Sequence, residues 1–259
     1  MFPSGTPMPA AETDAPLPAP PPLSEHWALF LDVDGCLLEF EDDPDLVRVP
    51  PSLSRQLALI AQRLDGALAL VSGRGIAGID RLFAPARFPA GGLHGLELRG
   101  AAMPQAEPAA AVEPGAWAAV VADARAWLAA HPRSRVEDKG RALALHWRAE
   151  PEAEPRVRAF AALALARLPG YRLQPGDCVL ELRPDGADKG AAIAAFLAQP
   201  PFAGRRPVFA GDDLTDEHGF ALVNRRDGIS IVVGNRRPTL ATHRLADPAA
   251  VRRWLQEAA

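Results

Sequence analysis

The chain has 259 residues, of which 48% are hydrophobic and 23% are charged, and its formal net charge is -4. This balance is typical of a soluble globular protein, and the absence of a dense Lys/Arg run argues against nucleic acid as a partner. No apolar stretch is long enough to cross a membrane, and the N-terminus lacks the basic and apolar regions of a secretory signal. With only two cysteines, Cys36 and Cys178, we expect a protein of the reducing cytoplasm.

The first part of the chain is rich in proline. Residues 1–24 contain eight prolines among Ala, Ser, Gly and acidic residues. Such a segment lacks the apolar content needed to pack, so we predict that residues 1–24 form a disordered tail. A partner-binding proline segment is the weaker interpretation, because the prolines have no regular spacing around basic residues. We expect the folded part to begin at Trp27.

Short uninterrupted apolar runs indicate strands that are buried on both faces of a parallel sheet. These runs are residues 28–31, 67–71, 208–210 and 229–233. Apolar residues with helical spacing occupy stretches between them, at residues 52–64 and 187–198. Strands that alternate with helices predict an open α/β fold.

The middle of the chain has a different pattern. A helix opens near residue 114 and ends at Pro132, and strand-like pieces follow at 135–137 and 142–148. A second helix at about 155–168 and strands at 171–174 and 178–183 complete the unit. Helix, hairpin, helix, hairpin predicts a small α+β unit whose helices cover one sheet face while the other face stays polar. The predicted division is a tail at 1–24, a first core part at 25–103, an inserted cap at 104–183 and a second core part at 184–259.

Acidic and polar residues follow several of the predicted buried strands. Asp32 and Asp34 come after the first strand, Ser72 after the second and Asp212 after the third, while Lys189 opens a predicted helix. Open α/β sheets bind ligands at the carboxyl ends of their strands, so we expect these side chains to gather there. Acids, a hydroxyl and a lysine in one place predict a site for phosphate and a divalent cation, for which Mg²⁺ is the best fit. Turns that merely use Asp and Gly are the alternative, which weakens because several segments end in the same way.

The order of these residues resembles the four motifs of the haloacid dehalogenase (HAD) superfamily. The matching segments are Asp32-Val33-Asp34-Gly35, Ser72, Lys189, and Gly211-Asp212-Asp213 with Asp216. The resemblance implies an HAD-like Rossmannoid core with a parallel sheet and an inserted α+β cap. It also implies that Asp32 attacks phosphorus to form an aspartyl phosphate, and that Asp34 acts as general acid and then as general base.

The same resemblance implies the metal ligands and the phosphate contacts. The implied ligands of Mg²⁺ are Asp32, the main-chain carbonyl of Asp34, and Asp212. The residues implied to support the metal site are Asp213 and Asp216. Ser72 and Lys189 would hold the phosphoryl oxygens, and we interpret Arg74 as an anchor for the loop after Ser72. Cys36 stands where the family usually has Thr or Val, and we interpret it as a small buried residue rather than a nucleophile.

Longer segments resemble the trehalose-6-phosphate phosphatase family over nearly the whole chain after residue 26. They include Gly92-Leu93-His94-Gly95, Val136-Glu137-Asp138-Lys139-Gly140, Leu145-His146-Trp147-Arg148 and Leu180-Glu181-Leu182-Arg183-Pro184. The resemblance implies that cap residues Glu137, Lys139 and Glu181 contact the disaccharide, with His94 and Arg148 as further contacts. Taken alone, residues 137–139 also fit a solvated turn, and His94 also fits a loop histidine bonded to local backbone.

Other activities of the same core are alternatives. They are a phosphatase for sucrose phosphate or mannosyl phosphoglycerate and, less favoured, a phosphosugar mutase. A non-catalytic phosphosugar-binding module is the alternative from another class, but such a module has no need of a nucleophile beside a proton donor. We therefore predict a Mg²⁺-dependent trehalose-6-phosphate phosphatase that acts as a cytoplasmic monomer on a small sugar phosphate, with no nucleic acid or membrane partner.

Overall fold

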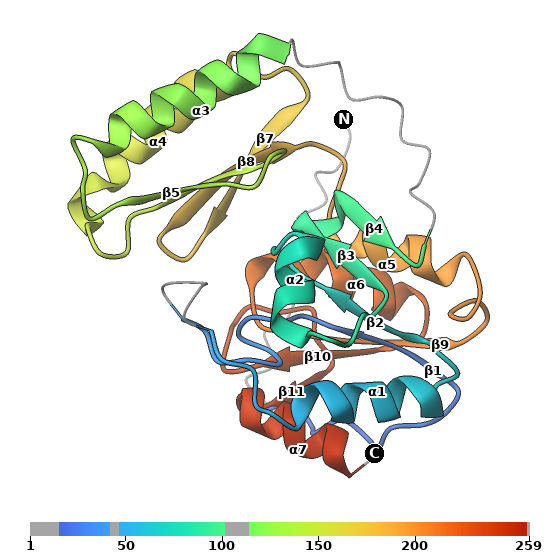
Figure 1. The fold of residues 1–259 in the computed structure, drawn as a ribbon. Helices are drawn as coiled ribbons and strands as arrows, with labels where there is room; N and C mark the ends of the chain where they lie inside the picture. Colours follow the sequence, from blue (N-terminus) through green and yellow to red (C-terminus); the bar gives the residue numbers. More distant parts are fainter. Residues whose placement is uncertain (1–15, 42–46, 102–113, 258–259) are drawn as a thin grey trace, which may run out of the picture.

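The computed structural model describes residues 16–41, 47–101 and 114–257. They form a core with a seven-stranded sheet and a cap with a four-stranded sheet (Figure 1). Residues 1–15 of the predicted tail and the predicted boundary at 103/104 lie outside the described residues, and we propose that the cap returns to the core near Pro184. In the described ranges, every helix is too short or too polar to span a lipid bilayer.

The core sheet confirms the predicted α/β fold. Its strand order is β11-β10-β9-β1-β2-β3-β4, in which β4 is antiparallel to β3 and the other neighbours are parallel. The strands are β1 (Trp27–Leu31), β2 (Leu68–Val71), β3 (Ala90–Gly92), β4 (Glu97–Arg99), β9 (Arg206–Gly211), β10 (Ile229–Val233) and β11 (His243–Leu245). Each of the four predicted apolar runs is a strand, and β1, β2 and β10 are buried along their whole length.

Helices cover both faces of this sheet, which explains why its central strands are apolar throughout. The core helices are α1 (Leu53–Arg63), α2 (Ile76–Phe83), α5 (Lys189–Leu197), α6 (Glu217–Arg225) and α7 (Pro248–Gln256). Helices α1 and α7 lie together on one face, and α5 and α6 lie together on the other (Figure 1). Phe30 of β1 packs against α5 and the segment after it, with its ring centroid 6.0 Å from that of Phe196 and 5.5 Å from that of Phe202.

The cap has the predicted α+β pattern. Its antiparallel strand order is β5-β6-β8-β7. Its elements are α3 (Pro114–Leu128), β5 (Arg135–Asp138), β6 (Leu143–His146), α4 (Glu154–Leu165), β7 (Tyr171–Gly176) and β8 (Val179–Pro184). Both helices lie on the sheet face turned away from the core (Figure 1). Leu143, Leu145, Leu180 and Leu182 are buried under them in the hydrophobic cluster of the cap, so the prediction that helices cover one face of this sheet is confirmed.

Residues 16–24 pack against the core, and the prediction of a disordered tail is wrong for this part. Leu23 is only 5% exposed. The indole N–H of Trp254 donates to the carbonyl of Pro21 at 2.9 Å, and the backbone N–H of Arg244 donates to the carbonyl of Pro18 at 2.9 Å. Proline has no N–H to donate, but its carbonyl still accepts a hydrogen bond, so a proline-rich segment can be fixed by donors from its neighbours.

Removing residues 1–24 is expected to lower the free energy of unfolding by about 3 kcal/mol, because one buried leucine and two hydrogen bonds are lost. Thermal unfolding measures this effect. A protein that begins at residue 16 is the matched control, because it keeps these contacts. Equal unfolding midpoints for proteins that begin at residues 16 and 25 would contradict the packing of this segment.

Candidate active site

Asp32 and Asp34 lie in a turn directly beyond the end of β1. Asp32 is buried, and the turn contains Gly35, which has a φ of 76°. A Cβ atom on residue 35 would lie 2.1 Å from Oδ2 of Asp212, so only glycine fits both the backbone conformation and the close approach. Gly35 therefore allows the acids that follow β1 and β9 to meet.

Three carboxylates gather at the carboxyl end of the sheet. Asp32, Asp212 and Asp216 each place one oxygen within 4.8 Å of the others. Asp216 ends the short helix η3 (Leu214–Asp216), and one of its oxygens accepts the backbone N–H groups of Asp212 and Asp213 at 3.0 and 2.9 Å. The ammonium of Lys189, at the first residue of α5, lies 3.0 Å from Asp32 and 2.7 Å from Asp216. The structure thus brings together the acids and the lysine that the sequence predicted to gather.

The charges of this cluster do not balance, because one buried ammonium faces three carboxylates. Burial raises the pKa of Asp32 to about 7, although Lys189 opposes the shift while Asp216 adds to it. Burial and the Asp32 carboxylate also raise the pKa of Asp212 well above its ordinary range. Burial alone would lower the pKa of Lys189, but Asp216 and Asp32 raise it, so this side chain is a permanent cation. A further cation in the cluster would favour the ionised carboxylates.

The residues of the cluster fit a divalent cation with oxygen ligands. Oδ1 of Asp212 is buried and has no hydrogen-bond partner within the described ranges, and a buried carboxylate oxygen needs a donor or a metal ion beside it. The donor set consists of carboxylates, which suits Mg²⁺. The side chain of Asp213 has a different task, because it accepts the backbone N–H of Leu214 and caps η3.

Ser72 and Arg74 bring a second polar group to the site. Ser72 is buried after β2, and its hydroxyl oxygen accepts the backbone N–H of Arg74 at 3.1 Å. The guanidinium of Arg74 donates twice to the carboxylate of Asp34, at 2.7 Å each. Such a bidentate pair fixes the orientation of both partners. Arg74 therefore holds Asp34 directly, a role that the prediction of a loop anchor missed.

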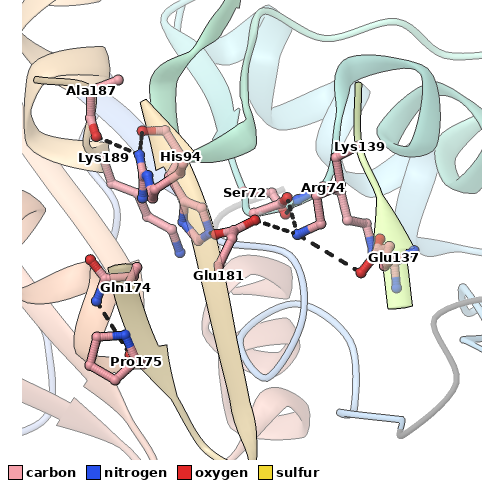
Figure 2. Close-up of polar contacts among 12 residues, drawn as sticks. Ser72, Arg74, His94, Glu137, Lys139, Gln174, Pro175, Glu181, Ala187 and Lys189 are labelled. Atoms are coloured by element: carbon pink, nitrogen blue, oxygen red, sulfur yellow. Dashed lines mark hydrogen bonds and ion pairs between the residues drawn. The ribbon is translucent and has the colours of Figure 1, made fainter. Parts of the chain in front are cut away.

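The cap reaches the core through Lys139. Its ammonium donates to the Gly73 carbonyl at 3.2 Å and to Oε1 of Glu181 at 3.0 Å, and lies 3.9 Å from Glu137 (Figure 2). Nε2 of His94, from the core, lies 3.3 Å from the other oxygen of Glu181. Four of the five residues predicted to bind sugar therefore form one connected group between cap and core.

Glu181 lies within this group and not on the wall of the cavity. It is 5% exposed, and both of its oxygens are engaged by Lys139 and His94. Burial alone would raise the pKa of Glu181, but Lys139 and His94 hold it below its ordinary range. Burial lowers the pKa of His94 to about 4 against the pull of Glu181, so the imidazole is neutral at pH 7. Glu181 orients the two side chains that flank it, and its predicted contact with the sugar stays a prediction.

A cavity of about 500 Å³ lies between the cap and the core. Its size is within the range of pockets for small-molecule ligands and admits a disaccharide phosphate. The predicted site residues on its wall are Asp32, Asp34, Ser72, His94, Glu137, Lys139, Arg148, Lys189, Asp212 and Asp213. Arg74, Phe40 and Thr215 also line it, and the sequence pattern assigned none of them to the site.

Two named proteins are similar in sequence to this chain over most of their own length. The trehalose-phosphatase family model matches residues 30–249. A probable trehalose-phosphate phosphatase of Sinorhizobium fredii is 46% identical over 211 residues, which are 81% of this chain and 78% of that protein. The trehalose-6-phosphate phosphatase of Escherichia coli is 43% identical over 242 residues, which are 93% of this chain and 90% of that protein.

A solved structure described as a trehalose-6-phosphate phosphatase related protein has a TM-score of 0.69 and 25% identity, and the match covers 88% of this chain and 95% of that one. The matched range of the family model includes the whole acid cluster and the cap. The chain therefore belongs to the trehalose-phosphatase family of phosphomonoester hydrolases.

Proposed function

We propose that the protein hydrolyses trehalose 6-phosphate to trehalose and inorganic phosphate, the activity for which its relative from Escherichia coli is named. The observation that carries the proposal is a cavity with acids, a serine and a lysine at the core and polar side chains from the cap. A non-catalytic binding module has no need of this combination. We also propose that the enzyme is a cytoplasmic monomer, and its unpaired cysteines, Cys36 and Cys178, suit a reducing compartment.

Asp32 is the proposed nucleophile. Its carboxylate attacks phosphorus, the bond from phosphorus to the sugar oxygen breaks, and an aspartyl phosphate forms that water then hydrolyses. This two-step route replaces a direct hydrolysis that would have a higher barrier. Lys189, 3.0 Å from Asp32, offsets the repulsion between the carboxylate and the phosphate dianion. Mg²⁺ held by Asp32 and Asp212 would add further stabilisation of the transferring charge.

Asp34 is the proposed proton carrier. It protonates the leaving sugar oxygen in the first step and takes a proton from water in the second. The bidentate pair with Arg74 fixes the orientation of the Asp34 side chain. Arg74 is therefore a positioning residue for Asp34.

The cap is proposed to bind the sugar through Glu137 and Lys139. Both line the cavity, and neither has a place in phosphoryl transfer. Lys139 is kept in place by Glu181 and by the Gly73 carbonyl of the core. A cap held against the core in this way also excludes water from the acid cluster.

Phosphate release from a panel of sugar phosphates tests this function. We expect the largest kcat/KM for trehalose 6-phosphate, at least about tenfold above sucrose phosphate, mannosyl phosphoglycerate and glucose 6-phosphate. We also expect activity to vanish with a chelator and to return with Mg²⁺. A preference for another sugar phosphate would overturn the substrate assignment. Full activity after thorough chelation, confirmed by metal analysis, would overturn the role of the cation.

A further inference from the structure

Phe40 and Arg148 meet across the cavity. Phe40 belongs to the core and is 60% exposed, whereas the other phenylalanines of the core are buried wherever the structure describes them. Arg148 belongs to the cap, just beyond β6, and its guanidinium carbon lies 5.3 Å from the centroid of the Phe40 ring. An exposed phenylalanine on a cavity wall is unusual. A cation–π contact with the guanidinium over its ring explains its position.

The cap holds Arg148 from its other side. Its guanidinium donates to the carbonyl of Asp177 at 3.1 Å and to the carboxylate of Asp177 at 2.8 Å. Asp177 lies in the turn between β7 and β8, at the end of the cap sheet opposite Pro184, where the chain returns to the core. Asp177 of the cap and Phe40 of the core therefore both contact the guanidinium of Arg148.

The register of the cap sheet separates Arg148 from Glu137, which is proposed to bind the sugar. Ala144 of β6 pairs with Glu137 and Glu181, and His146, two residues later, pairs with Val179. Two residues along a strand advance about 6.6 Å, a step comparable with the size of one sugar ring. Glu137 pairs with Ala144, and side chains two apart on a strand share a sheet face, so Glu137 and His146 both line the cavity. Arg148, two residues beyond the end of β6, also lines it.

We propose that Phe40 positions Arg148 over the end of the cavity where the non-phosphorylated ring of a disaccharide phosphate lies, and that this contact favours substrates with a second ring. The inference rests on the proposed function. The planar guanidinium stacks on the aromatic face, and this contact fixes its orientation where Arg148 lines the cavity wall. Phe40 acts through Arg148, so it is a positioning residue and takes no part in phosphoryl transfer.

Variants of Phe40 test the inference by their effect on two substrates. Phe40→Leu keeps an apolar side chain but removes the aromatic face, and Phe40→Tyr keeps that face. With trehalose 6-phosphate, we expect Phe40→Leu to raise KM by about threefold to tenfold with little change in kcat, and Phe40→Tyr to stay near wild type. With a small aryl phosphate, which does not extend to Arg148, both variants are expected to match wild type. Leu240→Ala is the matched control, because Leu240 is 55% exposed and does not line the cavity.

A double-mutant cycle shows whether Phe40 acts through Arg148. In an Arg148→Met background, Phe40→Leu is expected to cause no further rise in KM. Three results would overturn this inference and leave the proposed function standing. They are an additive rise in KM in the double variant, an equal loss of kcat/KM with both substrates, and a Phe40→Leu enzyme that matches wild type with trehalose 6-phosphate. A wild-type enzyme without activity on trehalose 6-phosphate would overturn the proposed function and the inference with it.

Discussion

Replacement of Asp32 by Asn is expected to reduce phosphate release by at least about a thousandfold. The amide keeps the shape of the side chain, but it is a far weaker nucleophile and a far weaker ligand for a cation. Asp32 lies 3.0 Å from Lys189 and within 4.8 Å of two other carboxylates, so the rest of the site stays in place around the amide. Steady-state phosphate release from trehalose 6-phosphate measures the effect.

The Asp32→Asn protein is also expected to unfold at or above the wild-type temperature. In the wild-type protein, burial and the nearby Asp216 raise the pKa of Asp32 to about 7, so a neutral side chain is favoured at this position. Asp65→Asn is the matched control, because Asp65 is an exposed aspartate of the core and has a positive φ that asparagine tolerates. Wild-type turnover is expected for this control, and near wild-type turnover by a folded Asp32→Asn protein would contradict the mechanism.

Replacement of Lys189 by Met is expected to affect both stability and activity. Lys189 is 1% exposed and contacts the carboxylates of Asp32 and Asp216. Loss of the ammonium leaves two buried carboxylates without this partner, a change that costs about 3–5 kcal/mol when measured without added metal. Because the same cation faces the transferring phosphoryl group, we expect kcat/KM to fall by at least about a hundredfold.

An exposed ion pair provides the control for this experiment. In the cap, Nη1 of Arg167 lies 2.6 Å from Oδ2 of Asp123, and both side chains are about half exposed. Arg167→Met is expected to change the free energy of unfolding by less than about 1 kcal/mol and to leave turnover unchanged. Chemical denaturation and phosphate release report the two effects. Similar stability losses for the Lys189 and Arg167 variants would contradict the placement of Lys189 in the buried cluster.

Strands with a strong local signal were predictable, and short strands were not. The run at residues 229–233 is β10 residue for residue, because a strand covered on both faces is apolar at every position. Strands β3, β4 and β11 have three residues each, too few for any periodicity. The prediction that residues 16–24 are disordered was wrong because it was based on their low content of apolar side chains. The segment is held mainly by hydrogen bonds from donors more than 200 positions away in the chain.

The chemical residues of the site were predictable because they follow buried strands whose ends must meet at one edge of the sheet. Contacts between cap and core were not, because they depend on how the two units sit together. Sequence alone did not show that Arg74 pairs with Asp34, that Glu181 contacts both Lys139 and His94, or that Phe40 lies against Arg148. Each of these features joins segments that are far apart in the chain.

Detection of a phosphoryl group on Asp32 tests the central claim most directly. The wild-type enzyme with Mg²⁺ and trehalose 6-phosphate is quenched in acid during turnover, digested and examined by mass spectrometry. We predict a peptide heavier by one phosphoryl group on Asp32, absent without substrate and absent in Asp32→Asn. A phosphoryl group on another residue, or turnover of trehalose 6-phosphate by the Asp32→Asn enzyme at the wild-type rate, would contradict phosphoryl transfer through this aspartate.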